Sequence, residues 1–387
     1  MQSGQPGVGM SVMNRAVELA LDAGQRQMAQ QALAYAHMMR GEREASEGIY
    51  RGLLAENASN VVAMVGMARL SSRKGEFEEA ATWLEKAQRA GGGTRDLSLE
   101  WAELDMGAGA FDKARLILER IVDEDPTFVR GWIMLASIHH QQKDEAGLRR
   151  CLDRLDAMRG SEWAAGLVRA QVAMERMDLT TARRGFEAVH KAQPRNVNVL
   201  DRLLQIDLLE MKRDWARTHV TALLRLDPNH GLANYVMGSL QVADGEYALA
   251  EDSLRRSVAA QPSPAAHNDL ACVLARRGRF VEAEQQVRAA LASRKDMWHA
   301  WDTLATIQMQ TGRIKDAKAS LGEALTLAAE EPVVNLHRAE VHLIEGEREA
   351  AGTVLDSIAG KRAQMSLEDQ KRYDELRLSL AVPKPRP

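Results

Sequence analysis

Small and bulky apolar residues recur along this chain every three or four positions, the spacing that places them on one face of an α-helix. The stretch 231–264, GLANYVMGSLQVADGEYALAEDSLRRSVAAQPSP, shows the pattern most clearly. It predicts a first helix over 232–243 and a second helix over 247–259. Gly245 ends the first helix because glycine adopts a positive φ without a Cβ clash. Pro262 stops the second helix because proline cannot continue a helical hydrogen-bond ladder.

The same pattern recurs about ten times at a spacing of 34 residues, with one spacing of 33 between the seventh and eighth units. Gly238 lies inside a helix, where glycine costs about 1 kcal/mol relative to alanine, so we expect the second helix to cross there, opposite Ala250. The positions equivalent to Gly238 are small in nine of ten units: Ala34, Ala68, Ala102, Ala136, Ala170, Leu204, Gly238, Ala271, Ala305 and Ala339. Those equivalent to Ala250 are small in nine of ten: Ser46, Ala80, Ala114, Leu148, Ala182, Ala216, Ala250, Ala283, Ala317 and Ala351. Four residues further on, every unit has a bulky apolar residue: Tyr50, Leu84, Leu118, Leu152, Phe186, Val220, Leu254, Val287, Leu321 and Leu355.

The turn between the two helices carries glycine in seven units: Gly41, Gly75, Gly109, Gly245, Gly278, Gly312 and Gly346. The fourth, fifth and sixth units have Lys143, Met177 and Met211 there instead. We expect these three units to pack or bend differently, because a side chain disfavours the left-handed conformation.

The spacing and the residue columns resemble the tetratricopeptide repeat (TPR), a helix–turn–helix unit of 34 residues. Two units match the start of the family's motif, at Trp132, Leu135, Ala136 and at Trp301, Leu304, Ala305. The terminal proline of the motif is present at Pro126, Pro194, Pro228 and Pro262. The resemblance covers 27–365 and implies an all-α fold, a right-handed α-solenoid (superhelix) of about ten repeats.

The predicted organisation has five parts. Residues 1–10 are expected to be a flexible leader, and 11–26 to form a helix that is either a cap or half of a further repeat. The array occupies 27–365. A capping signal starting at Ser366 opens a last helix over 366–380, which we expect to shield the end of the array from solvent. Residues 381–387 are predicted to be a disordered tail.

Composition excludes several functional classes. The net charge is −3 with 27% charged residues, so the chain lacks the basic surface of a nucleic-acid binder. Cys151 and Cys272 fall in different repeats and form no metal motif; we expect Cys151 to be a buried thiol. The sequence contains no apolar run long enough to span a membrane and no signal peptide. We therefore expect a cytoplasmic protein if residue 1 is the native start, and a periplasmic one if a signal or anchor was removed.

The known catalytic and cofactor motifs are absent from the sequence: it has no HExxH, Walker A, GxSxG or CxxC pattern. The histidines are scattered without a spacing suited to metal ligation. We therefore predict that the chain is not an enzyme and holds no cofactor or metal.

The resemblance implies that the first helices of successive repeats line a concave inner groove that holds a peptide or a partner's helix. By register, the residues expected on this face are Arg69, Arg73, Leu99, Glu103, Ile133, Ser137, His140, Leu167, Gln171, Gln205, Leu208, Tyr235, Ser239, Asn268, Arg276, Thr306 and Met309. One column of this set is polar and can pair with a ligand's backbone: Ser137, Gln171, Gln205, Ser239 and Thr306. Arg69 and Arg73 lie four apart on one helix face and are either a small patch for acidic ligands or a solvated charged face.

Two specialised forms of the family do not fit. Of the positions where some members clamp a C-terminal carboxylate, only Arg69 has a suitable side chain. Members joined to a sugar transferase carry an asparagine ladder, whereas the matching positions here are Ala32, Gly66, Glu100, Met134 and Val168.

We therefore expect a non-catalytic scaffold or adaptor for protein–protein interaction, with a peptide or partner subunit in the concave groove. Two alternatives remain open. The chain is either a structural assembly component of a bacterial envelope machine, such as secretion, pilus or exopolysaccharide export, or the regulatory arm of an enzyme encoded elsewhere. Self-association through the array ends is a further possibility, because an uncapped end exposes apolar helix faces.

Overall fold

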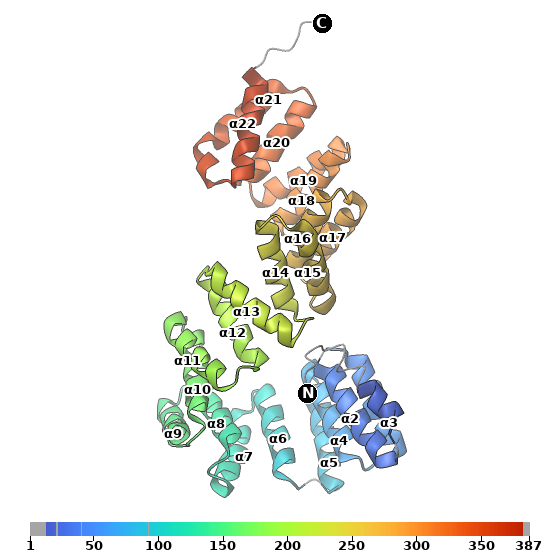
Figure 1. Cartoon of the computed structure of the whole chain (residues 1–387), viewed down its shortest axis with the longest axis vertical. Helices are drawn as coiled ribbons and strands as arrows, with labels where there is room; N and C mark the ends of the chain where they lie inside the picture. Colours follow the sequence, from blue (N-terminus) through green and yellow to red (C-terminus); the bar gives the residue numbers. More distant parts are fainter. Residues whose placement is uncertain (1–12, 21, 40, 92, 382–387) are drawn as a thin grey trace. The chain divides into compact units, whose positions relative to one another are not determined.

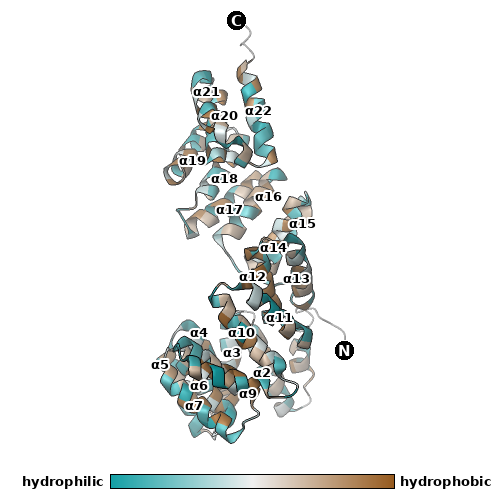
Figure 2. Ribbon diagram, turned by 90° about the vertical axis from the view of Figure 1, so that its left-hand side faces the viewer, coloured by the Kyte–Doolittle hydropathy of each residue, from teal (hydrophilic) through white to brown (hydrophobic). Residues whose placement is uncertain are grey.

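The computed structural model describes residues 13–20, 22–39, 41–91 and 93–381. Within these ranges the chain is helical between its turns and contains no strand, as the repeat pattern predicted. Contacts between residues divide the chain into two compact units. The first unit runs to Trp215 and also includes Arg225–Pro228. The second unit consists of Ala216–Leu224 and the residues from Asn229 onward. The helices follow one another as pairs along the chain (Figure 1), and the helices carry both hydrophobic and hydrophilic residues (Figure 2).

The first unit contains five full helix pairs and the first helix of a sixth. Their bounds are α2 (Ala23–Met39) and α3 (Arg43–Glu56), α4 (Val61–Lys74) and α5 (Phe77–Arg89), α6 (Arg95–Gly107) and α7 (Phe111–Glu124), α8 (Val129–Gln141) and α9 (Glu145–Asp156), α10 (Glu162–Glu175) and α11 (Leu179–Ala192), then α12 (Val197–Leu209). The second helix of the sixth pair, α13 (Arg213–Leu226), has residues in both units.

The second unit contains four more pairs and a final helix. Their bounds are α14 (Gly231–Ala243) and α15 (Tyr247–Ala260), α16 (Pro264–Arg276) and α17 (Phe280–Ser293), α18 (Trp298–Gln310) and α19 (Ile314–Leu327), α20 (Pro332–Ile344) and α21 (Arg348–Ile358), then the 3-10 helix η1 (Ala359–Gln364) and α22 (Leu367–Ala381). The helices predicted over 232–243 and 247–259 thus agree with α14 and α15 to within one residue.

The start of the array differs from the prediction. Instead of one helix over 11–26, residues 13–18 form a short helix and α2 already begins at Ala23. The Asp22 carboxylate accepts a hydrogen bond of 2.8 Å from the Gln25 backbone nitrogen, and this capping bond starts the helix four residues earlier than expected. The leader predicted over 1–10 lies outside the described residues, as does the predicted tail except for Ala381, which ends α22.

The predicted helix crossings are buried in every pair. All ten positions equivalent to Gly238 and all ten equivalent to Ala250 are buried, and nine of the ten bulky apolar positions that follow are buried as well. Small residues at the crossing let the two helix backbones approach, and the bulky residue one turn later fills the space beside them. Cys151 is also buried, as predicted, with 2% of its surface exposed.

The fourth pair departs from the predicted columns at one position. Leu148 is buried, as assigned, and Gly147 beside it contacts the His139 ring: a Cβ there would lie 2.2 Å from His139 Nδ1. Leu152, assigned to the core, is only half-buried, whereas the neighbouring Cys151 is buried. The assignment of the buried apolar position to Leu152 was therefore wrong for this repeat.

The turns are uniform, contrary to the prediction for the fourth to sixth units. All seven turn glycines have φ between 74° and 83°, and Lys143, Met177 and Met211 adopt φ of 58°, 57° and 56°. The packed helix pair sets the turn geometry, so a non-glycine residue there adopts the left-handed conformation at a cost of about 1–2 kcal/mol.

Ion pairs link each helix pair to the next. Residues near the start of a second helix reach the turn of the following pair, as in Glu47–Lys74 at 3.4 Å, Arg217–Asp244 at 2.5 Å and Lys318–Glu345 at 2.7 Å. Exposed pairs of this kind contribute about 0–1 kcal/mol each. They therefore support the stacking register, while the buried apolar columns supply most of the stability.

The last helix, α22, packs against the tenth pair, in the segment 366–380 where a capping helix was predicted. Ser366 Oγ accepts a hydrogen bond of 3.1 Å from the Asp369 backbone nitrogen and pairs with the Asp369 carboxylate at 2.7 Å, which starts α22. Tyr373 and Leu376 of α22 are buried in the core cluster of the tenth pair. In the part of the chain that the structure describes, none of the helices has the length and apolar character needed to cross a membrane.

Candidate functional site

The residues predicted to face the groove all lie on first helices, eleven in the first unit and six in the second. Arg69 and Arg73 are on α4, Leu99 and Glu103 on α6, Ile133, Ser137 and His140 on α8, Leu167 and Gln171 on α10, Gln205 and Leu208 on α12, Tyr235 and Ser239 on α14, Asn268 and Arg276 on α16, and Thr306 and Met309 on α18. Two of them are buried and cannot contact a ligand in this structure. Leu99 is 3% exposed in the core around Leu118, and Asn268 is 7% exposed.

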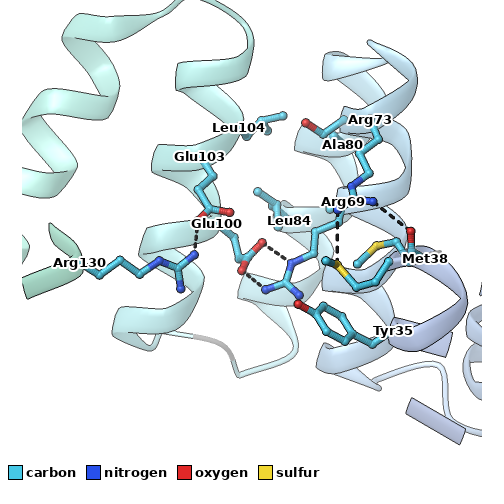
Figure 3. Close-up of a pocket in the computed structure, with 13 residues that line it drawn as sticks. Tyr35, Met38, Arg69, Arg73, Ala80, Leu84, Glu100, Glu103, Leu104 and Arg130 are labelled. Carbon is cyan, nitrogen blue, oxygen red and sulfur yellow. Dashed lines mark hydrogen bonds and ion pairs between the residues drawn. The ribbon is translucent and has the colours of Figure 1, made fainter. Parts of the chain in front are cut away.

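Three of the predicted residues meet in one pocket of about 360 Å³, here called the N-terminal pocket. Its walls come from the first helices α2, α4 and α6, with Arg130 at the start of α8, and its floor from α5 (Figure 3). Arg69, Arg73 and Glu103 were predicted to lie here. Tyr35, at the position equivalent to Arg69, was missed, although the register alone would have placed it on the same face.

Arg69 is neutralised inside this pocket. Its guanidinium makes a bidentate pair with the Glu100 carboxylate, with 2.8 Å between Arg69 Nε and Glu100 Oε2, and stands over the Tyr35 ring at 5.9 Å (Figure 3). The hydrogen bonds that Arg69 donates to Glu100 raise the pKa of Arg69. Glu103 is likewise paired, with Arg130. Arg69 and Glu103 therefore bridge neighbouring repeats and shape the pocket wall.

Arg73 is different, because it is exposed and makes no ion pair with a described acidic residue. Its Nη1 donates to the Met38 carbonyl oxygen at 3.0 Å and its Nη2 contacts Met39 Sδ at 3.6 Å. Since neither contact carries a formal negative charge, the pocket keeps one positive charge that is available to an anionic group. Arg69 and Arg73 were predicted to form a patch for acidic ligands, but only Arg73 keeps a positive charge that a ligand can pair with.

A second pocket, of about 210 Å³, is lined mainly by residues of α14 and α16 and is called the α14–α16 pocket here. It brings together two predicted residues, Ser239 and Arg276, with Asp269 and Cys272, which the sequence analysis did not select. Tyr235 hydrogen-bonds to Asp269; burial raises the pKa of Asp269 and raises the pKa of Tyr235 to about 12. Burial also raises the pKa of the Cys272 thiol to about 11.

The polar column predicted to pair with a ligand backbone is largely engaged within its own helices. The hydroxyls of Ser137, Ser239 and Thr306 donate to the carbonyl oxygen four residues earlier, at 3.0–3.1 Å. Gln205 donates to Asp201 at 2.7 Å, whereas Gln171 is exposed. The hydroxyls retain acceptor lone pairs, but their protons are already donated. Toward a ligand they can therefore act only as hydrogen-bond acceptors.

The remaining predicted residues are not gathered into these two pockets. His140 Nε2 lies 2.8 Å from Glu175, which joins α8 to α10. The others are apolar side chains left half-buried or exposed on the first helices: Ile133, Leu167, Leu208 and Met309.

One cluster has spacing suited to a cation: the possible ligand atoms of His342, Glu345 and Glu347 lie within 4.8 Å of one another. The cluster is exposed or half-buried at the turn of the tenth pair. Lys318 already pairs with Glu345 at 2.7 Å, and His342 with Glu347 at 2.5 Å. The carboxylates of Glu345 and Glu347 are thus already engaged by side chains, and we assign no metal site here.

Sequence comparison places a known family on the second half of the chain. The tetratricopeptide repeat family matches residues 212–263, 235–297 and 299–331. No curated protein sequence matches the chain.

Several solved structures are similar to the chain. The Cut9–Hcn1 complex of the anaphase-promoting complex aligns over 96% of this chain and 80% of its own, with 16% identity and a TM-score of 0.47. The type IV pilus biogenesis factor PilW aligns over 53% and 97%, with 20% identity and a TM-score of 0.44. YrrB, described as a TPR protein with an unusual peptide-binding site, aligns over 51% and 98%, with 14% identity and a TM-score of 0.40. Similarity at this level carries no argument about function.

The family match spans helices from α13 to α19, where the turn glycines and the small crossing residues follow the repeat pattern most regularly. The helix pairs before and after it keep the same 34-residue register, the same buried columns and the same left-handed turn residue. The chain therefore has a tetratricopeptide-repeat fold, and the family itself is matched over residues 212–297 and 299–331.

Proposed function

We propose that this protein is a non-catalytic scaffold that holds a peptide or a segment of a partner subunit in the N-terminal pocket. The tetratricopeptide fold implies a protein–protein interaction scaffold, and proteins built from these repeats are generally not catalytic. The observation that carries the proposal is Arg73, an exposed guanidinium without an ionic partner among the described residues, at the wall of a pocket of about 360 Å³.

The pocket favours a partner segment that combines an acidic group with apolar side chains. A carboxylate can pair with Arg73, while the exposed side chains of Tyr35 and Met39 offer apolar surface beside it. In the Arg69–Glu100 and Glu103–Arg130 pairs each charge is neutralised by its partner. These residues therefore contribute the shape of the pocket and hydrogen-bond acceptors more than charge.

The test is affinity capture from the native cell extract with the whole chain, followed by cross-linking and mass spectrometry. The variant Arg73→Glu reverses the one uncompensated charge of the pocket. We expect it to lose the partner that cross-links to α2, α4 and α6, because a carboxylate would then face a carboxylate. Retention of that partner at full strength by Arg73→Glu would refute the proposal.

Arg120→Glu is the matched control. Arg120 is an exposed arginine on the second helix α7, outside the N-terminal pocket. Both substitutions change the net charge equally, so a general electrostatic effect would weaken capture in both variants. Circular dichroism should show the same helix content and melting temperature for the two.

A further inference from the structure

An ion pair between two residues far apart in the sequence involves one lining residue of the α14–α16 pocket. Arg276, at the end of α16, makes a bidentate pair with Glu368 in the first turn of α22, at 2.7 and 3.1 Å, although the two residues are 92 positions apart. The same guanidinium lies 5.5 Å from the Tyr247 ring. Arg276 also lines the α14–α16 pocket, whereas Glu368 does not.

We propose that the α14–α16 pocket is a second binding site, for an acidic peptide whose carboxylate pairs with Arg276, and that Glu368 occupies Arg276 until the peptide displaces it. This inference rests on the proposed function, because it assumes that inner faces of the repeats bind peptides. It adds a separate site in the second unit and a chemical class of partner.

The first argument is that the chain already places a carboxylate, that of Glu368, on the Arg276 guanidinium. Planar bidentate pairing with a guanidinium selects carboxylates over other acceptors, and an aromatic ring beneath the arginine holds its plane in place. A partner's aspartate or glutamate therefore meets a guanidinium already oriented by Tyr247.

The second argument is that Glu368 can leave at little cost. The side chains of Arg276 and Glu368 are 44% and 68% exposed, and exposed pairs contribute about 0–1 kcal/mol. The helix carrying Glu368 does not need to move, because Tyr373 and Leu376 anchor α22 in the core of the tenth pair. Rotation of one exposed side chain is enough to free Arg276.

The third argument concerns the orientation of the peptide. Asp269 lines the same pocket seven residues before Arg276 on α16, which is about 10 Å along the helix axis. It accepts a hydrogen bond from Tyr235 and offers the pocket an acceptor rather than a donor. An extended peptide covers this distance in about three residues. The expected ligand therefore has an acidic residue and, three positions away, a lysine, an arginine or another hydrogen-bond donor.

Cys272 reports the state of Arg276, because it lines the same pocket one helical turn before the arginine. While Glu368 neutralises Arg276, the thiol is slow to ionise and slow to react. In Glu368→Gln the guanidinium loses its countercharge, so the thiolate is favoured. We expect iodoacetamide to alkylate Cys272 several-fold faster in the full-length Glu368→Gln chain, measured by mass spectrometry of the peptide that contains Cys272. Glu375→Gln, also on α22 but paired with Arg372, is the control and should not change this rate.

The binding step is tested by panning a phage-displayed library of random peptides on the Glu368→Gln chain, after depletion on Glu368→Gln/Arg276→Gln. We expect selected peptides to carry an acidic residue with a donor three positions away, to protect Cys272 from alkylation, and to bind more weakly to the wild type and as salt rises. The swapped pair Arg276→Glu/Glu368→Arg should restore slow alkylation without binding these peptides.

Three results would overturn the inference: an unchanged alkylation rate in Glu368→Gln, selected peptides that bind equally without Arg276, or a library from which no acidic peptide is enriched. Arg73→Glu separates this test from the proposed function. It should leave the selected peptides bound, since it lies in the N-terminal pocket. If Arg73→Glu abolishes capture of the native partner while the panning fails, the second site is wrong and the proposed function stands.

Discussion

Gly238 faces Leu254 at the closest approach of α14 and α15: a Cβ added to the glycine would lie 2.7 Å from Leu254 Cγ. Both residues are buried, and the carbonyl oxygen of Ala250 lies 3.5 Å from the same point. The glycine that is unfavourable inside a helix is therefore explained by the crossing, as the repeat register predicted. The nearest contact is the leucine side chain rather than Ala250 itself.

This crossing gives a direct test of the register. Ala250→Leu places a large side chain where the helix backbones meet, so we expect the free energy of unfolding to fall by about 1–3 kcal/mol. Ala248→Leu, at an exposed position of the same helix, should leave the melting temperature unchanged, because alanine and leucine have similar helix propensities. Equal melting temperatures for the two variants would contradict the assigned crossing.

A tighter contact joins the first pair to the second, between the Tyr50 ring of α3 and Gly66 of α4. A Cβ at position 66 would lie 2.3 Å from Tyr50 Cζ. Gly66→Ala gains about 1 kcal/mol of helix propensity but overpacks the contact by about 1–3 kcal/mol, so we expect a net loss of stability. In a Tyr50→Leu background, which has the leucine found at this position in other repeats, the same substitution should cost much less. Urea unfolding of the four proteins in this cycle measures the coupling, and additive effects would argue against it.

The non-glycine turns predict stabilising substitutions. Met211 adopts φ of 56° and is 89% exposed, so its side chain contributes little packing. Met211→Gly should stabilise the chain by about 0.5–1 kcal/mol, because relief of a strain of about 1–2 kcal/mol exceeds the entropy that glycine loses on folding. Met211→Ala removes the same exposed side chain but keeps the Cβ, and is expected to give no gain in melting temperature.

The pair between His337 of α20 and Asp302 of α18 predicts a pH dependence. Their Nδ1 and Oδ1 atoms are 2.7 Å apart. Burial lowers the pKa of His337, but the charge of Asp302 and the hydrogen bond to it outweigh this and raise the pKa above its ordinary 6.5. A histidine with a raised folded-state pKa stabilises the fold fully below its unfolded pKa, and this contribution is lost as the pH rises through the folded pKa.

We therefore expect His337→Gln to lower the melting temperature more at about pH 5.5 than at about pH 8.5. Melting curves by circular dichroism at the two pH values, for the wild type and the variant, measure this difference. Asp302→Asn should show the same dependence, since it removes the charge that raises the pKa. A loss of equal size at both pH values would mean that the histidine acts through packing alone.

Much of the fold follows from local residue columns. The helix bounds of the seventh pair, the buried crossings and the seven glycine turns were all predicted, because a 34-residue period aligns the same contacts ten times. The exceptions are positions where an adjacent residue is buried in place of the predicted one. In the fourth pair, Leu152 is only half-buried, whereas the neighbouring Cys151 is buried.

The candidate site was less predictable, since a register identifies a helix face but not what other side chains do on it. Arg69 and Arg73 share one face, yet Glu100 neutralises the first and leaves the second uncompensated. The pairing of Arg276 with Glu368 crosses 92 residues and has no sequence signature.

The sequence by itself determined the repeat, the helix pairs and the face of each helix that is buried, because these depend on the spacing of small and apolar residues within about 34 positions. Only the tertiary structure decided which charged side chains pair with one another and which, like Arg73, have no ionic partner among the described residues. Such pairs depend on distances between helices of different repeats, and ion pairing falls off over a few ångströms in three dimensions rather than along the chain.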